Sequence, residues 1–402
     1  MISFDELIAG KGVFQDRAVL SPHYLPESLL FREEEVRRIM TSVAPVLQGA
    51  KAKNLFVYGN TGTGKTSSLK QVMAKLIERN DPRVYVVYMN CRVYDSRYKV
   101  LQKVITTFKP HFAKSGYSFT VLYEELLNWV EVGGKEKVEG KHLVVVLDEI
   151  DYVSDLDDLV YTLTRANDDL SKGSVSVIGI SNKVSFKQRL DPRSKSSLCE
   201  EEVVFPPYNA TQLQGILQQR SVRAFEPSVL SDSAVNLASA IAAGENGDAR
   251  YALLLLLRAG ELAEQRGLKR ISDLEVEEAR KLADEEKAFE VISSLPEHQR
   301  LLLYSLALLS EDVTFKRLVE DGSDKLYFSG IVYEKYVSLC KKTGKEPRTS
   351  RWYREYLSEL EMLGLINTVQ SGKGVRGHTT LIKLAYPESK VKGAIEKTLL
   401  SE

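Results

Sequence analysis

The first half of the chain alternates short apolar runs with longer amphipathic segments. The apolar runs are rich in β-branched residues and carry few polar side chains, which is typical of parallel strands covered on both faces. We predict strands at 54–58, 84–90, 142–147, 175–180 and 202–205. Between them, apolar positions recur with helical spacing at 67–78, 99–108, 119–130 and 156–170. This alternation predicts an α/β domain over residues 1–207, in which helices cover both faces of a parallel sheet.

The pattern changes after the Pro206-Pro207 pair. Only helical spacing follows, at 211–225, 231–243, 249–266 and 272–289, which predicts a small all-helical domain over residues 208–289. Residues 290–402 then begin with predicted helices at 297–309, 328–343 and 349–363. Two strand-like arms, 365–369 and 380–385, follow with a glycine-rich tip between them. Three helices and a two-stranded ribbon are the order of a winged-helix domain.

Composition narrows the class of protein. The chain has 402 residues, enough for two or three domains, and it has 55 basic and 55 acidic residues. Any nucleic-acid surface must therefore be local. The three cysteines are widely spaced, which favours neither a disulfide framework nor a zinc site. The acidic start is not that of a signal peptide and no apolar run could span a bilayer, so we expect a cytoplasmic protein.

The string YGNTGTGKT, residues 58–66, follows the first predicted strand. It fits the spacing G-x-x-x-x-G-K-[ST], in which glycines let backbone N–H groups turn toward a phosphate. Lys65 is expected to reach the β- and γ-phosphates of a nucleoside triphosphate, and Thr66 is expected to bind Mg²⁺ through its hydroxyl. The alternative is a glycine-rich turn that happens to contain a lysine. The predicted nucleotide-binding residues of the loop are Asn60, Thr61, Gly62, Thr63, Gly64, Lys65, Thr66 and Ser67.

Two further apolar strands end in polar residues. LVVVLDEID, residues 143–151, places Asp148 at a strand tip, where a carboxylate can hold the Mg²⁺ water shell. The next residue, Glu149, could polarise the attacking water as a general base. VIGISN ends in Asn182, whose amide could orient that water or contact the γ-phosphate. The alternatives are a strand that leads into a solvated acidic loop, and an asparagine that ends a strand for reasons of turn geometry.

Two arginines are candidates for contacting the γ-phosphate. Arg250 lies in NGDARYAL, at the start of a predicted helix of the helical domain. Arg193 lies in LDPRSKSSL, just before the last predicted strand. A guanidinium can bind spread negative charge through two parallel hydrogen bonds. Taken alone, each arginine could equally form a salt bridge at the surface.

The order of these motifs points to a family. In the order of its motifs the chain resembles the archaeal origin-recognition initiators. These motifs are the phosphate-binding loop at 58–66 (the P-loop), LDEID, ISN, DPRSKSSL, FPPYN, GDARYAL and the terminal winged helix. These initiators are AAA+ ATPases related to the eukaryotic origin-recognition and cell-division-control loaders. The segment LSPHYLPESLLFREEEV, residues 20–36, is similar to the adenine-side segment of that family. The resemblance covers nearly the whole chain and implies an AAA+ P-loop domain, a helical lid and a C-terminal winged-helix domain.

The resemblance also implies roles for individual residues. Asn182 is implied to be sensor 1, and Arg250 to be sensor 2 of the lid, acting on the nucleotide of its own subunit. Arg193 is implied to be an arginine finger that acts on a neighbour's ATP. Together with Glu149 these residues form the expected catalytic set, and ATP or ADP with Mg²⁺ is the expected ligand. The residues implied around the base and ribose are Tyr24, Arg32, Tyr208 and Ile216.

The winged-helix region carries a local excess of positive charge. Between residues 341 and 383, nine lysines and arginines stand against four acids. The predicted helix 349–363 begins at an N-cap type of residue, Thr349 or Ser350, and Leu357, Leu360 and Leu363 are its expected buried stripe. A recognition helix places its N-terminal residues in the major groove, and a small basic tip can enter the minor groove. The predicted DNA-binding residues are Arg348, Ser350, Arg351 and Arg354 at or near the N-terminal end of the helix and Lys373, Arg376, His378 and Thr379 at the tip.

A second basic stretch lies in the α/β domain. From residue 92 to residue 114, six lysines and arginines stand against one acid. Taken alone, such a helix is usually the solvated outside of an α/β domain. The resembled family carries an initiator-specific insertion here that touches origin DNA, which implies DNA contacts by Lys103 and Lys109. The arginines near the wing could likewise be a solvated face, and winged helices also bind proteins.

The sequence therefore predicts an ATP-dependent initiator of DNA replication with slow, switch-like hydrolysis of ATP to ADP. Its expected partners are duplex origin DNA, the replicative helicase and paralogous initiators on adjacent sites, and its expected location is the cytoplasm, in association with the nucleoid. Three other classes stay open: an ATP-binding winged-helix transcription regulator, a clamp-loader-like AAA+ remodeller, and an ATPase whose wing binds protein. Clamp loaders carry a Ser-Arg-Cys finger, which DPRSKSSL does not show.

Overall fold

The computed structural model of the chain describes residues 12–22, 24–113, 116–132, 140–183, 186, 188, 190–311, 326–370 and 380–399. Two compact units, Met1–Glu277 and Glu278–Glu402, divide the chain. Within those described ranges, no helix combines the length and the apolarity needed to cross a membrane. The first unit contains the α/β domain and the helices that follow it, and the second contains the winged helix.

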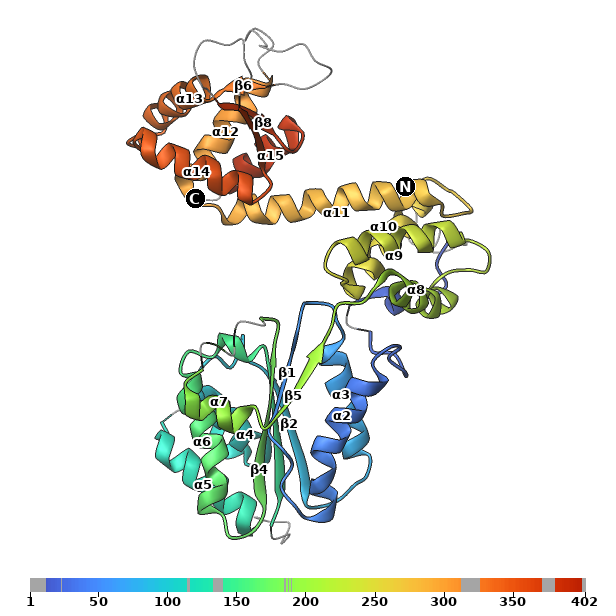
Figure 1. Cartoon of the computed structure of the whole chain (residues 1–402), viewed down its shortest axis with the longest axis vertical. Helices are drawn as coiled ribbons and strands as arrows, with labels where there is room; N and C mark the ends of the chain where they lie inside the picture. The colour runs from blue at the N-terminus through green and yellow to red at the C-terminus, as the bar shows by residue number, and fades with distance from the viewer. Residues whose placement is uncertain are drawn as a thin grey trace. The chain divides into compact units, whose positions relative to one another are not determined.

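A parallel sheet of five strands lies at the centre of the first unit, in the order β2-β3-β4-β1-β5 (Figure 1). Each strand lies within one residue of its predicted bounds, which confirms the predicted α/β fold. Because the strands are parallel, their carboxyl ends meet at one edge of the sheet, where ligands bind in folds of this kind. The strands are β1 (Leu55–Gly59), β2 (Val84–Asn90), β3 (His142–Asp148), β4 (Ser174–Ser181) and β5 (Glu201–Phe205).

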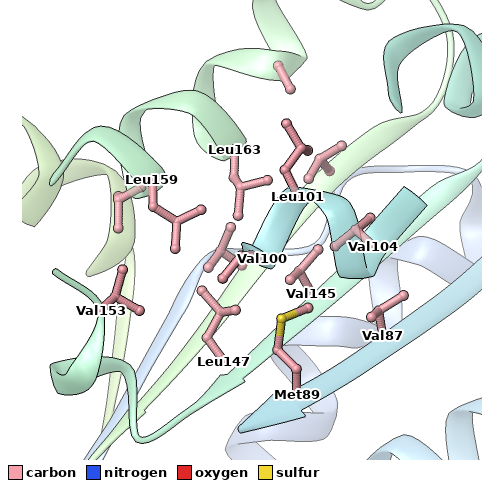
Figure 2. Packing of buried hydrophobic residues seen from close by; sticks show 14 of the residues in the cluster. Val87, Met89, Val100, Leu101, Val104, Val145, Leu147, Val153, Leu159 and Leu163 are labelled. Atoms are coloured by element: carbon pink, nitrogen blue, oxygen red, sulfur yellow. The ribbon is translucent and has the colours of Figure 1, made fainter. Parts of the chain in front are cut away.

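Helices cover both faces of this sheet (Figure 1). Side chains alternate along β3: Val144 and Val146 pack into the core under one layer of helices, and Val145 and Leu147 pack under the other (Figure 2). The helices predicted in this half of the chain are confirmed, whereas α2 and α7 were not predicted. The first layer contains α2 (Glu33–Val43) and α3 (Lys65–Ile77), and the second contains α4 (Arg97–Phe108), α5 (Phe119–Val132), α6 (Leu156–Asp169) and α7 (Pro192–Leu198).

A helical lid follows the sheet, with α8 (Ala210–Ala224), α9 (Asp232–Gly244) and α10 (Ala249–Gln265). The N-terminal part of the chain packs on these helices through the short 3-10 helix η1 (Arg17–Leu20). The rings of Phe14 and Phe225 stack 5.0 Å apart, and the backbone N–H of Gln15 donates to the carbonyl of Ala224 at 2.8 Å. The start of the described chain is thus attached to the lid, although the two segments are about two hundred residues apart in sequence.

The second unit has the winged-helix order, which confirms that prediction. The long helix α11 (Asp273–Ser294) spans the boundary between the units. Two elements were not predicted: a third strand, β6, which pairs with β8 in the antiparallel order β6-β8-β7, and a final helix, α15. The elements are α12 (Glu297–Glu311), β6 (Tyr327–Phe328), α13 (Ser329–Lys342), α14 (Ser350–Met362), β7 (Ile366–Gln370), β8 (Thr380–Leu384) and α15 (Glu388–Leu399).

One part of the predicted buried stripe of α14 is wrong. Leu357 and Leu360 are buried as predicted, but Leu363 is 42% exposed. The helix ends at Met362, and Gly364 takes a left-handed φ of 70° that turns the chain toward β7. Leu363 therefore lies in the turn and does not continue the buried face of the helix.

Candidate functional site

The P-loop connects β1 to α3, and its glycines are required by close contacts. A Cβ on Gly59 would lie 2.2 Å from the carbonyl oxygen of Phe205, and Gly62 and Gly64 take φ values of 68° and 92°. No side chain caps α3, whose N-cap residue is Gly64. The first backbone N–H groups of the helix are therefore available to a phosphate.

Lys65 is held in the loop that it is predicted to serve. Its ammonium donates to the carbonyls of Gly59 at 2.9 Å and Asn60 at 2.7 Å, and Thr63 donates its hydroxyl to the same Asn60 carbonyl. Burial is the main cause that lowers the pKa of Lys65 to about 8; the nearby charge of Arg250 acts in the same direction, and Asp148 and Asp248 oppose the shift. A bound polyphosphate would supply the negative charge that this buried ammonium lacks.

The two predicted metal ligands are brought together. Thr66 donates its hydroxyl to Asp148 Oδ2 at 3.0 Å, and Asp148 Oδ1 accepts from the backbone N–H of Glu149 at 3.0 Å. Tyr88, from the end of β2, also donates its hydroxyl to Asp148 Oδ2, and burial beside this carboxylate raises the pKa of Tyr88. A carboxylate and a hydroxyl side by side are the oxygen ligands that Mg²⁺ prefers, so these residues fit that ion.

Glu149 is restrained in this structure by two residues that the sequence analysis did not single out for it. Its carboxylate pairs with Arg92 Nε at 2.5 Å and accepts from the Asn90 side chain at 3.4 Å. The backbone of Glu149 is left-handed, with φ of 55°, which is uncommon for a residue with a side chain. The predicted general base is therefore turned toward the end of β2.

A cavity, called here the phosphate cavity, is lined by residues that include Lys65, Thr66, Asp148, Glu149, Asn182 and Arg250.

The lid contacts the P-loop directly. The backbone N–H of Ala249 donates to the carbonyl of Gly62 at 3.2 Å, and a Cβ on Gly62 would collide with the carboxylate of Asp248. Asp248 also caps α10 by accepting from the backbone N–H groups of Arg250 and Tyr251. The first turn of α10 thereby places Arg250 beside the predicted phosphate site.

A second cavity adjoins the first, and we call it the base cavity. Gly62, Gly64 and Arg250 line both cavities. The predicted base-side residues Tyr24, Tyr208 and Ile216 line the base cavity, as does the P-loop residue Ser67. Thr61, the remaining predicted loop residue, is exposed.

Arg32, also predicted near the base, braces the P-loop. Its buried guanidinium donates to the carbonyls of Thr63 at 2.9 Å and Pro206 at 2.5 Å, and it lies 3.8 Å from the centre of the Tyr208 ring. Arg32 therefore connects α2, the loop and the segment after β5.

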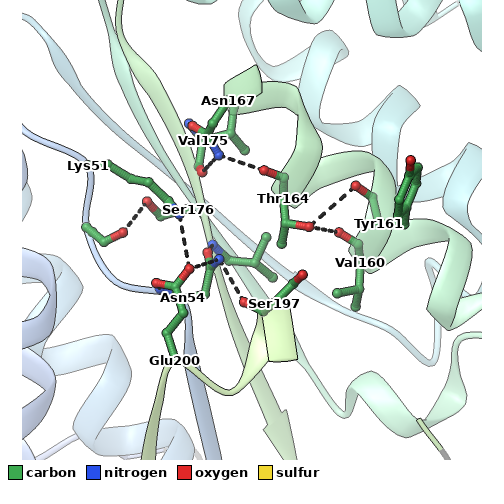
Figure 3. A network of polar contacts seen from close by, with 12 residues as sticks. Lys51, Asn54, Val160, Tyr161, Thr164, Asn167, Val175, Ser176, Ser197 and Glu200 are labelled. Carbon is green, nitrogen blue, oxygen red and sulfur yellow. Dashed lines mark hydrogen bonds and ion pairs between the residues drawn. The ribbon is translucent and has the colours of Figure 1, made fainter. Parts of the chain in front are cut away.

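Arg193 stands apart from these cavities. It is exposed in the first turn of α7, where Asp191 caps the helix by accepting from Ser194 N–H at 2.6 Å. The other end of α7 is fixed by buried Asn54, which donates to the carbonyl of Ser197 at 2.9 Å and to Glu200 at 3.0 Å (Figure 3). The structure thus holds Arg193 on an anchored helix, away from the nucleotide site of its own chain.

The predicted recognition helix presents its basic residues to solvent. Arg348, Ser350, Arg351 and Arg354 are exposed, and no ion pair to the last two is found among the described residues. Two tyrosines fix the segment before the helix, because Arg348 N–H donates to the Tyr336 hydroxyl at 3.2 Å and the Tyr333 hydroxyl donates to the Arg348 carbonyl at 3.1 Å. The predicted tip residues Lys373, Arg376, His378 and Thr379 lie outside the described residues.

Part of the positive charge of the second predicted DNA surface is already neutralised by an acidic side chain. Lys109 forms an ion pair with Glu125 of α5, and the exposed fraction of its side chain is 23%. The Lys103 ammonium lies 5.8 Å from the centre of the Tyr94 ring. A DNA contact by Lys109 would have to compete with this carboxylate.

Fold and site define a class: an AAA+ ATPase with a helical lid and a C-terminal winged helix. Family models match an AAA domain at residues 49–190, a Cdc6 AAA+ ATPase-type lid domain at 214–281 and a CDC6 C-terminal winged helix domain at 290–394. The ORC1-type DNA replication protein 1 of Archaeoglobus fulgidus is 39% identical over 398 residues, which cover 98% of this chain and 93% of that protein. That of Sulfurisphaera tokodaii is 40% identical over 96% of this chain and 93% of its own length.

A solved structure agrees with these relatives. The structure of the Aeropyrum pernix ORC1 protein in complex with DNA is 36% identical, with a TM-score of 0.71, and covers 96% of this chain and 97% of that one. The chain belongs to the ORC1/Cdc6 family of replication initiators. The resemblance drawn from its motifs is thus confirmed.

Proposed function

We propose that the protein is an ATP-dependent initiator that binds duplex origin DNA and helps to recruit or load the replicative helicase, alone or beside paralogous initiators. The observation that carries the proposal is a phosphate site and an exposed basic recognition helix in one chain of this family. A relative that is 36% identical has been solved in complex with DNA, which supports the DNA partner. We also propose the domains 1–207, 208–289 and 290–402, and association with the nucleoid.

At the nucleotide site, each group has a distinct task. Lys65 and the N–H groups of the P-loop bind the β- and γ-phosphates, and Thr66 and Asp148 hold Mg²⁺, which neutralises phosphate charge when bound. Glu149 takes the proton of the water that attacks the γ-phosphorus, while Asn182 orients that water. Tyr88 keeps the Asp148 carboxylate in place through its hydroxyl. Because Glu149 is bound to Arg92 in this structure, it must first leave that partner, which is consistent with slow turnover.

The lid transmits the nucleotide state, ATP or ADP, to the rest of the chain. Arg250 contacts the γ-phosphate and lies one residue from the Ala249 N–H that bonds to Gly62. Loss of the γ-phosphate therefore removes a contact that holds α10 against the loop. The lid continues into α11 and from there into the winged-helix domain, so ATP and ADP can set different states of one chain. Arg193 is proposed to meet the ATP of a neighbouring subunit.

DNA is bound through both charged surfaces. Arg348, Ser350, Arg351 and Arg354 contact the major groove, and Lys373, Arg376, His378 and Thr379 contact the minor groove beside it. Lys103 and Lys109 add phosphate contacts from the α/β domain. Phosphate contacts from separate modules give strong binding that weakens steeply with salt.

Footprinting of the purified protein on genomic fragments, with ATP and then with ADP, tests this function. We expect protection of discrete duplex sites that changes with the nucleotide. Recruitment of purified helicase to those sites separates an initiator from a transcription regulator with the same winged helix. Protein that ignores every duplex at low ionic strength would contradict the proposal.

A single substitution tests the recognition helix. We expect Arg351→Ala to weaken binding to a protected site about tenfold and to lower the slope of log K against log salt by about one. Fluorescence anisotropy over a series of salt concentrations measures both quantities. Lys397→Ala is the matched control, because Lys397 is an exposed lysine of α15 with no predicted DNA contact. An unchanged slope for Arg351→Ala would remove this residue from the DNA surface.

A further inference from the structure

The backbone of Arg348, just before the recognition helix, is held at both of its polar groups by tyrosines of the preceding helix. Tyr333 of α13 donates its hydroxyl to the Arg348 carbonyl at 3.1 Å, and the Tyr336 hydroxyl accepts from the Arg348 N–H at 3.2 Å. Every residue from 341 to 350 is exposed, so water could bond to these two backbone groups. The loop does not need the tyrosines to satisfy its backbone, and what they add is a fixed position for Arg348.

The tyrosines are themselves anchored in the winged-helix core. Tyr336 is fully buried, and its hydroxyl lies 2.8 Å from Nδ1 of His298 near the start of α12. The rings of Tyr333 and Tyr336 lie 6.1 Å apart. The neighbour of His298, Glu297, pairs with Lys345 of the same exposed loop at 2.8 Å. Because closely packed side chains stay in one arrangement, the two hydroxyls offer the loop bonding positions that do not move.

The start of α14 is not fixed by a side chain of its own. Its N-cap residue, Thr349, makes no capping hydrogen bond, although threonine commonly does so at this position. The contacts to the backbone of Arg348 therefore hold the chain where the helix begins. The guanidinium of Arg348 is exposed, and no hydrogen bond or ion pair to it is found among the described residues. The backbone of Arg348 is thus fixed while its charge stays available to an anionic ligand.

We propose that Tyr333 and Tyr336 are positioning residues for DNA binding, which hold the backbone of Arg348 in place before the duplex arrives. The inference rests on the proposed contact of Arg348 with DNA and adds the residues that order it. An arginine in an exposed loop otherwise loses conformational freedom on binding, and a loop that is already ordered avoids much of that cost. Since the two hydroxyls act through Arg348, their removal matters only while Arg348 is present.

A double-mutant cycle on the full chain tests this inference. Fluorescence anisotropy measures binding to a duplex oligonucleotide that carries a footprinted site, over a series of salt concentrations. We expect Arg348→Ala to weaken binding about tenfold and to lower the salt slope by about one. Tyr333→Phe combined with Tyr336→Phe should weaken binding about fivefold. Added to Arg348→Ala, the two tyrosine changes should cost less than about twofold more, because the contact they serve is already gone.

Tyr353→Phe is the matched control, because it removes the same hydroxyl group from the same aromatic cluster. Tyr353 is buried in α14, with its ring 4.9 Å from that of Tyr333. Its hydroxyl donates to the carbonyl of Ser329 at 2.8 Å and does not contact Arg348. We expect DNA binding by Tyr353→Phe to stay within about twofold of that by the unmodified protein.

Three results would overturn the inference. An equal loss in Tyr353→Phe would show a general loosening of the winged helix. A loss that adds fully to that of Arg348→Ala would show that the tyrosines act elsewhere. If Arg348→Ala binds the duplex unchanged, the inference fails while the proposed function stands, whereas a protein that binds no duplex fails both. If Tyr336→Phe does not fold, Tyr333→Phe completes the cycle alone, because Tyr333 is only partly buried.

Discussion

Lys65→Ala is expected to lower the affinity for ATP by about 100-fold. The substitution removes an ammonium that two P-loop carbonyls hold and that belongs to a residue lining the phosphate cavity, and a hydrogen bond to a charged group contributes roughly 1.5–3 kcal/mol. Titration calorimetry with Mg²⁺ and ATP measures the change. Lys75→Ala is the control, because Lys75 is an exposed lysine of the same helix. Full ATP binding by Lys65→Ala would refute the assignment of this loop as the phosphate site.

The same lysine predicts how ATP binding depends on pH. Its pKa is lowered to about 8 in the free protein, chiefly by burial, and a bound triphosphate stabilises the ammonium and raises that pKa. Below about pH 8 the lysine is already protonated, so its contribution to affinity is fully present. Above that pH the free protein must take up a proton to bind, and affinity falls by up to about tenfold per pH unit. Calorimetry from about pH 7 to about pH 9 checks this, and Lys65→Ala should lose the dependence.

The strands of the α/β domain were predictable because burial on both faces leaves an uninterrupted apolar run, as in β3. Helix α2 was missed because little of its surface is buried, so its apolar pattern is weak. Only Ile39, Ser42 and Val43 are buried in it, and its sequence carries five charged residues, so the apolar stripe is narrow. The strand β6 has two residues and depends on pairing with β8, which no local pattern can reveal.

The residues of the site likewise divide into those that a local motif marks and those that it does not. Residues inside a contiguous motif, such as Lys65 and Thr66, were predicted because the loop fixes their spacing. Tyr88, Arg92 and Arg220, which lines the base cavity, were missed as site residues because nothing local marks them. Tyr88 meets Asp148 only because β2 and β3 are paired in register, with Asn90 opposite Asp148. Arg220 meets Tyr24 only because the N-terminal segment packs on the lid, across nearly two hundred residues of sequence.

Glu149→Gln is expected to slow ATP hydrolysis by about 100-fold or more while leaving ATP bound. An amide keeps the shape of the side chain but cannot take a proton from water, and general-base catalysis typically contributes about 10²–10⁴ in rate. Single-turnover hydrolysis measures the effect, with ATP affinity measured in parallel. Arg92→Ala is the comparison variant, because it removes the ion pair at 2.5 Å that restrains Glu149. The hydrolysis rate of Arg92→Ala should therefore equal or exceed that of the unmodified protein. Undiminished hydrolysis by Glu149→Gln would assign the base to another residue.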